Sequence, residues 1–177
     1  MMQTRYMPKI DTTVPLLGFG CMRLPTNAAG EIDYPLAQAM IQRAYENGVN
    51  YFDTAYMYHG GKSEVFLGDT LPKYPRDSYY LTSKFPVAWC ESEEDVDRIF
   101  NEQLTRCKTE YFDFYLLHAL DKEKFAKVKK FDIYNKMLKY KAEGKIRRLG
   151  FSFHDTPDVI DEITNTYAFD FAQIQFN

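Results

Sequence analysis

The sequence predicts an α/β protein with a parallel sheet, in which residues 1–177 form one incomplete (β/α)8 TIM barrel domain. After an N-terminal β-hairpin, six strand-like segments alternate with about five helical ones, which is typical of a parallel sheet. Polar residues end several separate strands, which is how such a barrel builds a site. No G-x-G-x-x-G phosphate loop follows the first strand. A complete barrel takes eight strands and ~250 residues, so we interpret the chain as ending at the sixth strand.

The individual elements follow from apolar periodicity and turn residues. Residues 5–24 form a short hairpin and a strand, in which Gly18 and Gly20 mark close approach of the backbone to a neighbour. Gly48 ends the first helix as a C-cap, and acidic residues after Ser92 favour a helix start. The expected helices are 35–47, 63–71, 92–107, one within 122–143, and 156–166. After the first strand, one strand begins at Val49, and the others are expected at 79–85, 112–118, 146–153 and 169–176.

Composition excludes several classes of protein. A net charge of -3 gives no reason to expect nucleic acid or an anionic membrane as partner. No apolar run approaches the ~20 residues of a membrane span, and the N-terminus lacks the apolar centre of a secretory signal. The three cysteines, Cys21, Cys90 and Cys107, form no C-x-x-C pair, so we predict neither a metal site nor disulfides, but buried thiols in a cytoplasmic protein.

Four ionisable residues are candidates for catalysis. Asp53, Lys84 and His118 each stand near the end of a strand, and Tyr58 follows in the loop after Asp53. The period of two puts Lys84 on one side with Tyr80 and Thr82, and the same rule applies to Asp53 and His118. These side chains can therefore point into the barrel mouth, His118 sharing its side with Phe112, Phe114 and Leu116.

Together these groups suit the reduction of a carbonyl. A Lys84–Asp53 pair offsets the cost of burying both charges. A tyrosine acts as a general acid when a nearby cation brings its pKa, about 10 when free, toward neutrality. His118 can donate a hydrogen bond to a substrate oxygen beside the Tyr58 hydroxyl. Such a pocket stabilises a developing alkoxide and then protonates it, provided that a hydride arrives from the other face.

These residues and their spacing resemble the aldo-keto reductase family. D-T-A-Y-M-Y at 53–58, S-K at 83–84 and D-F-Y-L-L-H at 113–118 are similar to the segments that carry its catalytic tetrad. L-G-F-G at 17–20, G-x-S-E at 61–64 and G-F-S at 150–152 also match. The resemblance implies an NADP(H)-dependent reductase of a small-molecule carbonyl substrate, with Asp53, Tyr58, Lys84 and His118 as the tetrad and Tyr58 as the proton donor.

The resemblance also implies where the nicotinamide carboxamide is held. Ser152 and Gln173 fall on the positions after the fifth and sixth strands that hold it in the family. The family commonly has Asn after the Ser, whereas this sequence has Phe153 and then His154, which is a candidate for the same role. The remaining cofactor contacts of the family lie beyond the sixth strand.

A narrower likeness concerns a subgroup of these reductases. G-F-G-C-M-R-L-P at 18–25 and G-F-S-F-H-D at 150–155 resemble the members that carry a C-terminal iron–sulfur domain. None of the cysteine motif of that domain lies in this chain. An iron–sulfur cluster is therefore expected only in residues beyond those given.

Other interpretations stay open at this stage. Taken singly, Tyr58 is more often a packing residue, Lys84 a solvated rim lysine and His118 a core histidine; their joint placement favours a site. The chain could instead be a nicotinamide-binding regulatory module on the same scaffold, or a fragment that is inactive by itself. Trp89 suggests an aromatic wall for the substrate. The choice of NADP over NAD rests on the resemblance alone, and the oligomeric state is open.

Overall fold

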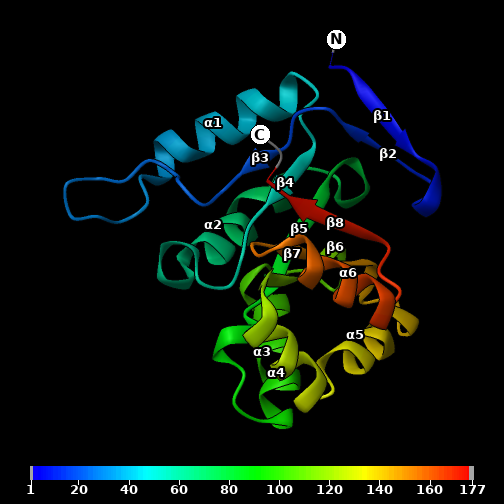
Figure 1. Cartoon of the computed structure of the whole chain (residues 1–177). Coiled ribbons are helices and arrows are strands. Elements are labelled where there is room, and N and C mark those ends of the chain that lie inside the picture. The colour runs from blue at the N-terminus through cyan, green and yellow to red at the C-terminus, as the bar shows by residue number, and fades with distance from the viewer. Residues whose placement is uncertain (1, 176–177) are drawn as a thin grey trace.

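The computed structural model describes residues 2–175, and its main feature is a six-stranded parallel sheet in the order β3-β4-β5-β6-β7-β8 (Figure 1). Every neighbouring pair is parallel, and strand order follows chain order. A doubly wound sheet would reverse its order at a switch point, whereas a barrel does not. The predicted front part of a (β/α) barrel is therefore confirmed. The strands are β3 (Phe19–Gly20), β4 (Tyr51–Asp53), β5 (Tyr80–Phe85), β6 (Phe112–Leu120), β7 (Ile146–Phe153) and β8 (Phe171–Ile174).

Several strands are shorter than the apolar runs in the sequence, whereas β7 has the expected bounds and β6 extends past the expected end at His118 to Leu120. The strand expected from Val49 begins at Tyr51, and the one expected at 169–176 is β8. Phe176, the predicted end of that strand, lies outside the described residues. Pairing limits these bounds, because a run of apolar residues continues past the last backbone hydrogen bond of the ladder.

The helices lie around the sheet, from α1 at the upper left of Figure 1 through α3 and α4 at the bottom to α5 at the right. One helix was expected between β6 and β7, but the structure has two. Asp132, between them, has φ of 50°, and this left-handed conformation interrupts a right-handed helix. The helices are α1 (Tyr34–Glu46), α2 (Lys62–Thr70), α3 (Glu93–Arg106), α4 (Lys122–Lys130), α5 (Ile133–Ala142) and α6 (Pro157–Thr166).

Local capping explains where several helices begin. The Ser92 hydroxyl accepts from the Asp95 N–H at 3.3 Å, and the Asp95 carboxylate accepts from the Ser92 N–H at 3.1 Å, which forms a capping box before α3. Asp33 and Asp121 cap α1 and α4 in a similar way. The helix start expected near Ser92 is therefore confirmed.

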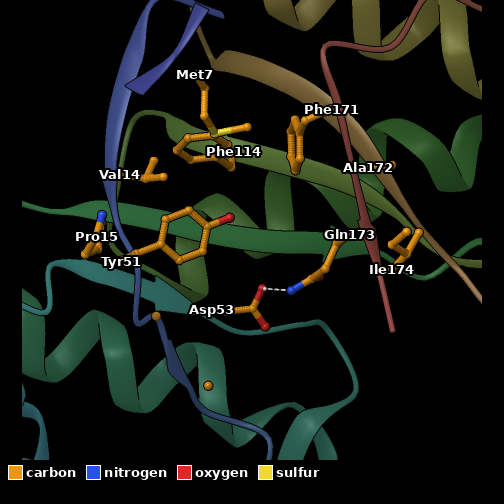
Figure 2. A pocket seen from close by; sticks show the side chains of 12 residues that line it. Met7, Val14, Pro15, Tyr51, Asp53, Phe114, Phe171, Ala172, Gln173 and Ile174 are labelled. Atoms are coloured by element: carbon orange, nitrogen blue, oxygen red, sulfur yellow. Dashed lines mark hydrogen bonds between the residues drawn. The ribbon is translucent and has the colours of Figure 1, made fainter. Parts of the chain in front are cut away.

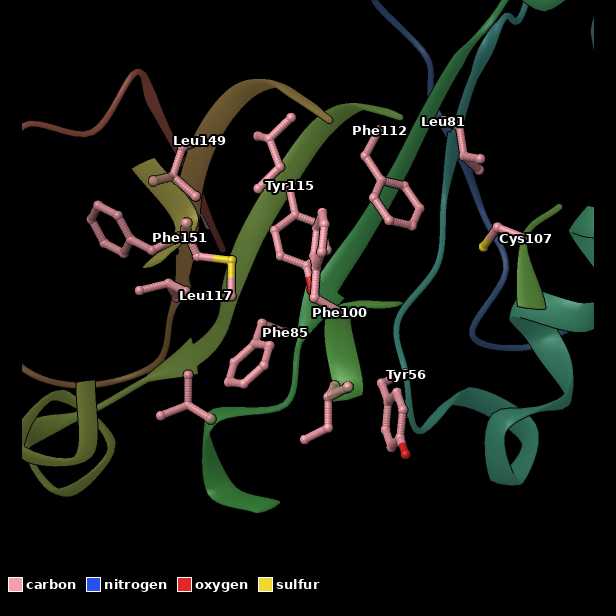
Figure 3. Close-up of a cluster of buried hydrophobic side chains, with 14 of the residues drawn as sticks. Tyr56, Leu81, Phe85, Phe100, Cys107, Phe112, Tyr115, Leu117, Leu149 and Phe151 are labelled. Atoms are coloured by element: carbon pink, nitrogen blue, oxygen red, sulfur yellow. The ribbon is translucent and has the colours of Figure 1, made fainter. Parts of the chain in front are cut away.

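The outer face of the sheet packs against the helices through aromatic rings (Figure 3). Phe100 of α3 is fully buried, with its ring centroid 5.1 Å from Tyr115 and 6.2 Å from Phe112. The position of Phe112 corrects the period-two expectation that it shares a side with Phe114. Phe112 is the first residue of β6 and is paired only with β7, so the alternation set by two neighbours begins after it.

The N-terminal hairpin lies against the amino ends of the strands. It consists of β1 (Thr4–Met7), the short 3-10 helix η1 (Pro8–Ile10) and β2 (Thr12–Pro15). The Tyr80 hydroxyl donates to the Thr13 carbonyl at 2.9 Å, and Arg148 donates to the Ile10 carbonyl at 3.1 Å. Both side chains come from the early part of their strands, so the hairpin leaves the carboxyl ends open for a site.

The two glycines of the first strand differ from the expectation that both meet a close neighbour. A Cβ on Gly18 would lie 3.2 Å from the Tyr51 ring, so this backbone does approach its neighbour closely. A Cβ on Gly20 would meet nothing within 4 Å among the described residues, so the prediction was wrong for Gly20.

None of the described helices is both long enough and apolar enough to cross a lipid bilayer.

Candidate active site

The side chain of Lys84 is the centre of the candidate site. Its backbone is in β5, and the residue is only 2% exposed. The ammonium nitrogen donates to Asp53 Oδ1 at 2.5 Å, to the carbonyl oxygen of Thr54 at 2.9 Å and to the Tyr58 hydroxyl at 3.4 Å. The pairing of Lys84 with Asp53 is thus present. These three acceptors match the three donors of an ammonium, so the buried charge is compensated.

Tyr58 reaches Lys84 because the chain turns back after β4. Tyr58 begins the 3-10 segment η2 (Tyr58–Gly61), in which His59, Gly60 and Gly61 all have positive φ. Glycine adopts such angles without strain, and their succession reverses the chain before α2. His59, which sequence reasoning left aside, accepts a hydrogen bond of 3.1 Å from the Leu24 N–H and fastens this turn to the loop after β3. The turn leaves the Tyr58 ring centroid 5.0 Å from the Lys84 ammonium.

His118 contacts Tyr58 from the neighbouring strand. The two ring centroids are 5.8 Å apart, with the rings nearly perpendicular. Burial and then the Lys84 ammonium lower the pKa of His118 from 6.5 to about 4, so the ring is neutral near pH 7. Its Nδ1 is buried and has no hydrogen-bond partner among residues 2–175. A neutral ring donates from one nitrogen, and we assign that role to Nε2 because Nδ1 has no acceptor.

The three residues expected to hold the carboxamide lie on the next two strands and the loop between them. Ser152 is 5% exposed, and its Oγ accepts from the Ala119 N–H at 2.7 Å. Gln173 of β8 donates to Asp53 Oδ2 at 3.4 Å (Figure 2). His154 is exposed, and its backbone N–H donates to the Leu120 carbonyl at 3.2 Å.

One cavity brings all seven candidate residues together. It has a volume of about 200 Å³ and is lined by Asp53, Tyr58, Lys84, His118, Ser152, His154, Gln173, Ile174 and Gln175. A larger cavity of about 550 Å³ shares Asp53 and Gln173 with it and continues along Tyr51, Phe114 and Phe171 (Figure 2). The polar recess therefore lies at the carboxyl ends of the strands, and the aromatic trough leads from it toward the N-terminal hairpin, whose Met7, Val14 and Pro15 also line it.

The wall suggested for Trp89 is not part of either cavity. Trp89 is 54% exposed and packs edge-on against Tyr56, with ring centroids 5.6 Å apart. Tyr56 in turn donates to Glu102 of α3 at 2.9 Å, so this pair belongs to the helical side of the sheet. Within residues 2–175, no group of three or more His, Cys, Asp or Glu side chains is placed to hold a metal ion.

Comparison with known proteins gives the same picture over most of the chain. The sequence profile described as the Aldo/keto reductase family matches residues 16–177. The chain is 28% identical to the "Probable aldo-keto reductase 1" of Glycine max, over 93% of this chain and 48% of that protein. It is 26% identical to the "NADH-specific methylglyoxal reductase" of Escherichia coli, over 94% of this chain and 56% of that protein.

Solved structures agree with these relatives. A holo aldo-keto reductase from Bacillus halodurans matches with a TM-score of 0.78 and 29% identity, over 99% of this chain and 58% of that one. An aldo-keto reductase from Klebsiella pneumoniae in complex with NADPH matches with a TM-score of 0.76 and 28% identity, over 94% of this chain and 55% of that one. The chain thus spans about half the length of these relatives. The profile match covers the strands and the recess alike, and the chain belongs to the aldo/keto reductase family, a family of oxidoreductases.

Proposed function

We propose that this protein reduces an aldehyde or ketone with NADP(H), and that Tyr58 donates the proton. The observation that carries the proposal is that the Lys84 ammonium contacts both Asp53 and Tyr58. Its ammonium pairs with Asp53 at 2.5 Å and also reaches the Tyr58 hydroxyl at 3.4 Å. A cation fixed in this way stabilises the phenolate that remains after Tyr58 gives up its proton.

Each residue of the recess has a distinct task in this proposal. Tyr58 protonates the alkoxide that develops on the substrate oxygen. Neutral His118 donates a hydrogen bond to the same oxygen and so orients the carbonyl. Asp53 holds the Lys84 ammonium by charge. The nicotinamide cofactor, when bound, supplies the hydride.

The residues present suit a primary amide such as the nicotinamide carboxamide. The Ser152 oxygen already accepts the Ala119 N–H, which leaves its O–H to donate to an amide oxygen. The Gln173 amide carries both a donor and an acceptor, and its bond to Asp53 is long at 3.4 Å, so it can exchange for a ligand. His154 is exposed at the rim of the same cavity and is proposed as a further polar contact.

The names of the relatives support a nicotinamide cofactor but do not decide between NADP(H) and NAD(H). The Klebsiella protein was solved with NADPH, whereas the Escherichia coli relative is called NADH-specific. We propose NADP(H) and expect NADPH to bind more tightly than NADH. A small carbonyl is the proposed substrate class, and methylglyoxal, named in the latter relative, is a suitable probe.

The test compares the protein with its Tyr58→Phe variant, by NADPH oxidation with methylglyoxal and by fluorescence titration of NADPH. The variant should lose turnover by about 10²- to 10⁴-fold, the usual contribution of a general acid, and should bind NADPH as before. Tyr34→Phe is a matched control, because Tyr34 lies on α1 and its hydroxyl donates to Asp69. Wild-type turnover in Tyr58→Phe would refute the proton donor. NADPH binding without turnover by the unsubstituted protein would support the regulatory module instead.

A further inference from the structure

A buried polar cluster lies on the face of β5 opposite the recess. It consists of Glu64 from α2, Ser83 from β5 and Gln103 from α3, and we call it the Glu64 cluster. All three residues are 0% exposed, and none of them lines either cavity of the site. Burying a carboxylate is costly unless its oxygens find donors, and burial raises the pKa of Glu64. The cluster therefore depends on its internal hydrogen bonds and on Arg106, whose guanidinium donates to Glu64 Oε2 at 3.3 Å.

These hydrogen bonds connect the cluster to the backbone carbonyl of Lys84. The Ser83 hydroxyl and the Gln103 amide each donate to Glu64 Oε1 at 2.6 Å. The same Gln103 amide donates to the carbonyl oxygen of Lys84 at 3.1 Å. The other end of the Gln103 amide accepts from the Tyr115 hydroxyl at 2.5 Å, which fixes its orientation. Gln103 of α3 thus holds the peptide group of Lys84 from outside the sheet, and Glu64 of α2 holds Gln103.

Ser63, which precedes Glu64 in α2, contacts Thr54, an acceptor of the Lys84 ammonium. Ser63 is fully buried, and its hydroxyl lies 2.8 Å from Thr54 Oγ1 and donates to the Cys21 carbonyl at 3.0 Å. Thr54 is also the residue whose carbonyl oxygen accepts from the Lys84 ammonium. Adjacent residues of α2 therefore bond to the side chain of Ser83, which precedes Lys84, and to Thr54, which receives its ammonium.

We propose that Gln103 and Glu64 are positioning residues, which set the location of the Lys84 ammonium beside Tyr58. Gln103 holds the Lys84 carbonyl, and Glu64 holds Gln103. This inference rests on the proposed function for its consequence in turnover. A displacement of about 1 Å in a catalytic group can cost on the order of 10²-fold in rate. A side chain that neither touches substrate nor lines the cavity thereby controls kcat.

The first test observes Lys84 itself and needs no turnover. The probe is the ¹H–¹⁵N signal of the Lys84 ammonium, identified as the signal that Lys84→Met removes. Gln103→Met keeps a similar side-chain volume and removes the bond to the Lys84 carbonyl, so this signal should shift or broaden. Thr70→Val is the matched control, because Thr70 is a buried polar residue of α2 that bonds to Gln38 and not to the cluster. Its Lys84 signal should stay unchanged.

The second test measures turnover with methylglyoxal. Gln103→Met should lower kcat about 10- to 100-fold with KM for NADPH within about twofold. Glu64→Gln keeps an oxygen for Ser83 and Gln103 and loses only the ion pair with Arg106, so it should change kcat and the Lys84 signal in the same direction but less. If Gln103→Met fails to fold, the Lys84 signal and kcat of Glu64→Gln test the inference by themselves.

Variants that lose stability while both the Lys84 signal and kcat match Thr70→Val would overturn the inference. Absence of turnover in the unsubstituted protein would refute the proposed function alone, since the Lys84 signal still decides positioning.

Discussion

The Ser152 hydroxyl oxygen accepts a hydrogen bond of 2.7 Å from the backbone N–H of Ala119, the residue directly after His118. Ala119 has φ of 52°, in the left-handed region, and the pairing of β6 with β7 is irregular between Leu117 and Leu120. A non-glycine residue in this conformation costs roughly 1–2 kcal/mol. The Ser152 bond offsets that cost and fixes the backbone from which His118 projects toward Tyr58.

Removing this hydroxyl should therefore destabilise the bulge. We expect Ser152→Ala to lower the free energy of unfolding by about 1–3 kcal/mol, because the Ala119 N–H loses its partner. Adding Ala119→Gly should recover part of the loss, since glycine adopts the same φ without strain. Urea denaturation of the single and double variants measures both effects. A double variant less stable than Ser152→Ala would contradict this account of the bulge.

Removing one partner of the Lys84–Asp53 pair should destabilise the protein more than removing both charges. Lys84→Met leaves the Asp53 carboxylate, whose side chain is 14% exposed, without its cation, which should cost about 3–5 kcal/mol. Asp53→Asn added to Lys84→Met removes the uncompensated charge and should restore much of the stability. Urea denaturation should rank the double variant above the Lys84→Met single, and NADPH oxidation should be lost in both. The opposite ranking would mean that solvent already compensates Asp53.

Stability should fall in acid because His118 is buried in its neutral form. Its pKa is about 4 in the folded protein against 6.5 ordinarily, so between these values the unfolded state binds the proton and the folded state does not. Stability therefore rises from pH 4 to pH 6.5 and is lost in the reverse direction, by roughly 3 kcal/mol in total. His118→Gln lacks this group, so its unfolding free energy should depend less on pH in that range. Equal pH dependence in the two proteins would rule out a depressed pKa.

Gly68 should tolerate no side chain. A Cβ at this position of α2 would lie 2.2 Å from the backbone oxygen of Arg106 in α3, so Gly68→Ala forces the two helices apart. We expect a loss of about 1–3 kcal/mol, typical of overpacking. Gly20→Ala, where a Cβ meets nothing within 4 Å among the described residues, should stay within about 0.5 kcal/mol of the unsubstituted protein. Thermal unfolding compares the pair, and equal midpoints would show that α2 and α3 adjust freely.

The fold class and the location of the recess could be predicted from the sequence because both depend on local order. Strict alternation of strands and helices makes the sheet parallel, and parallel strands present their carboxyl ends at one edge. Polar residues that end successive strands must then lie near that edge, as Lys84, His118 and Ser152 do. The alternation along β5 and β6 also separated the side that faces the cavity, with Lys84 and His118, from the side that faces the helices, except at Phe112.

The contacts between the side chains could not be predicted in this way. The turn directly after Tyr58 depends on three successive positive φ angles, and the break between α4 and α5 depends on one such angle at Asp132. Glu64 and Gln103 bond across 39 positions of sequence, which no local pattern records. Periodicity and capping depend on neighbouring residues, whereas these contacts depend on how α2 and α3 pack against β5. The sequence by itself therefore determined which groups stand at the open edge, and the tertiary structure decided which atoms touch and what holds them there.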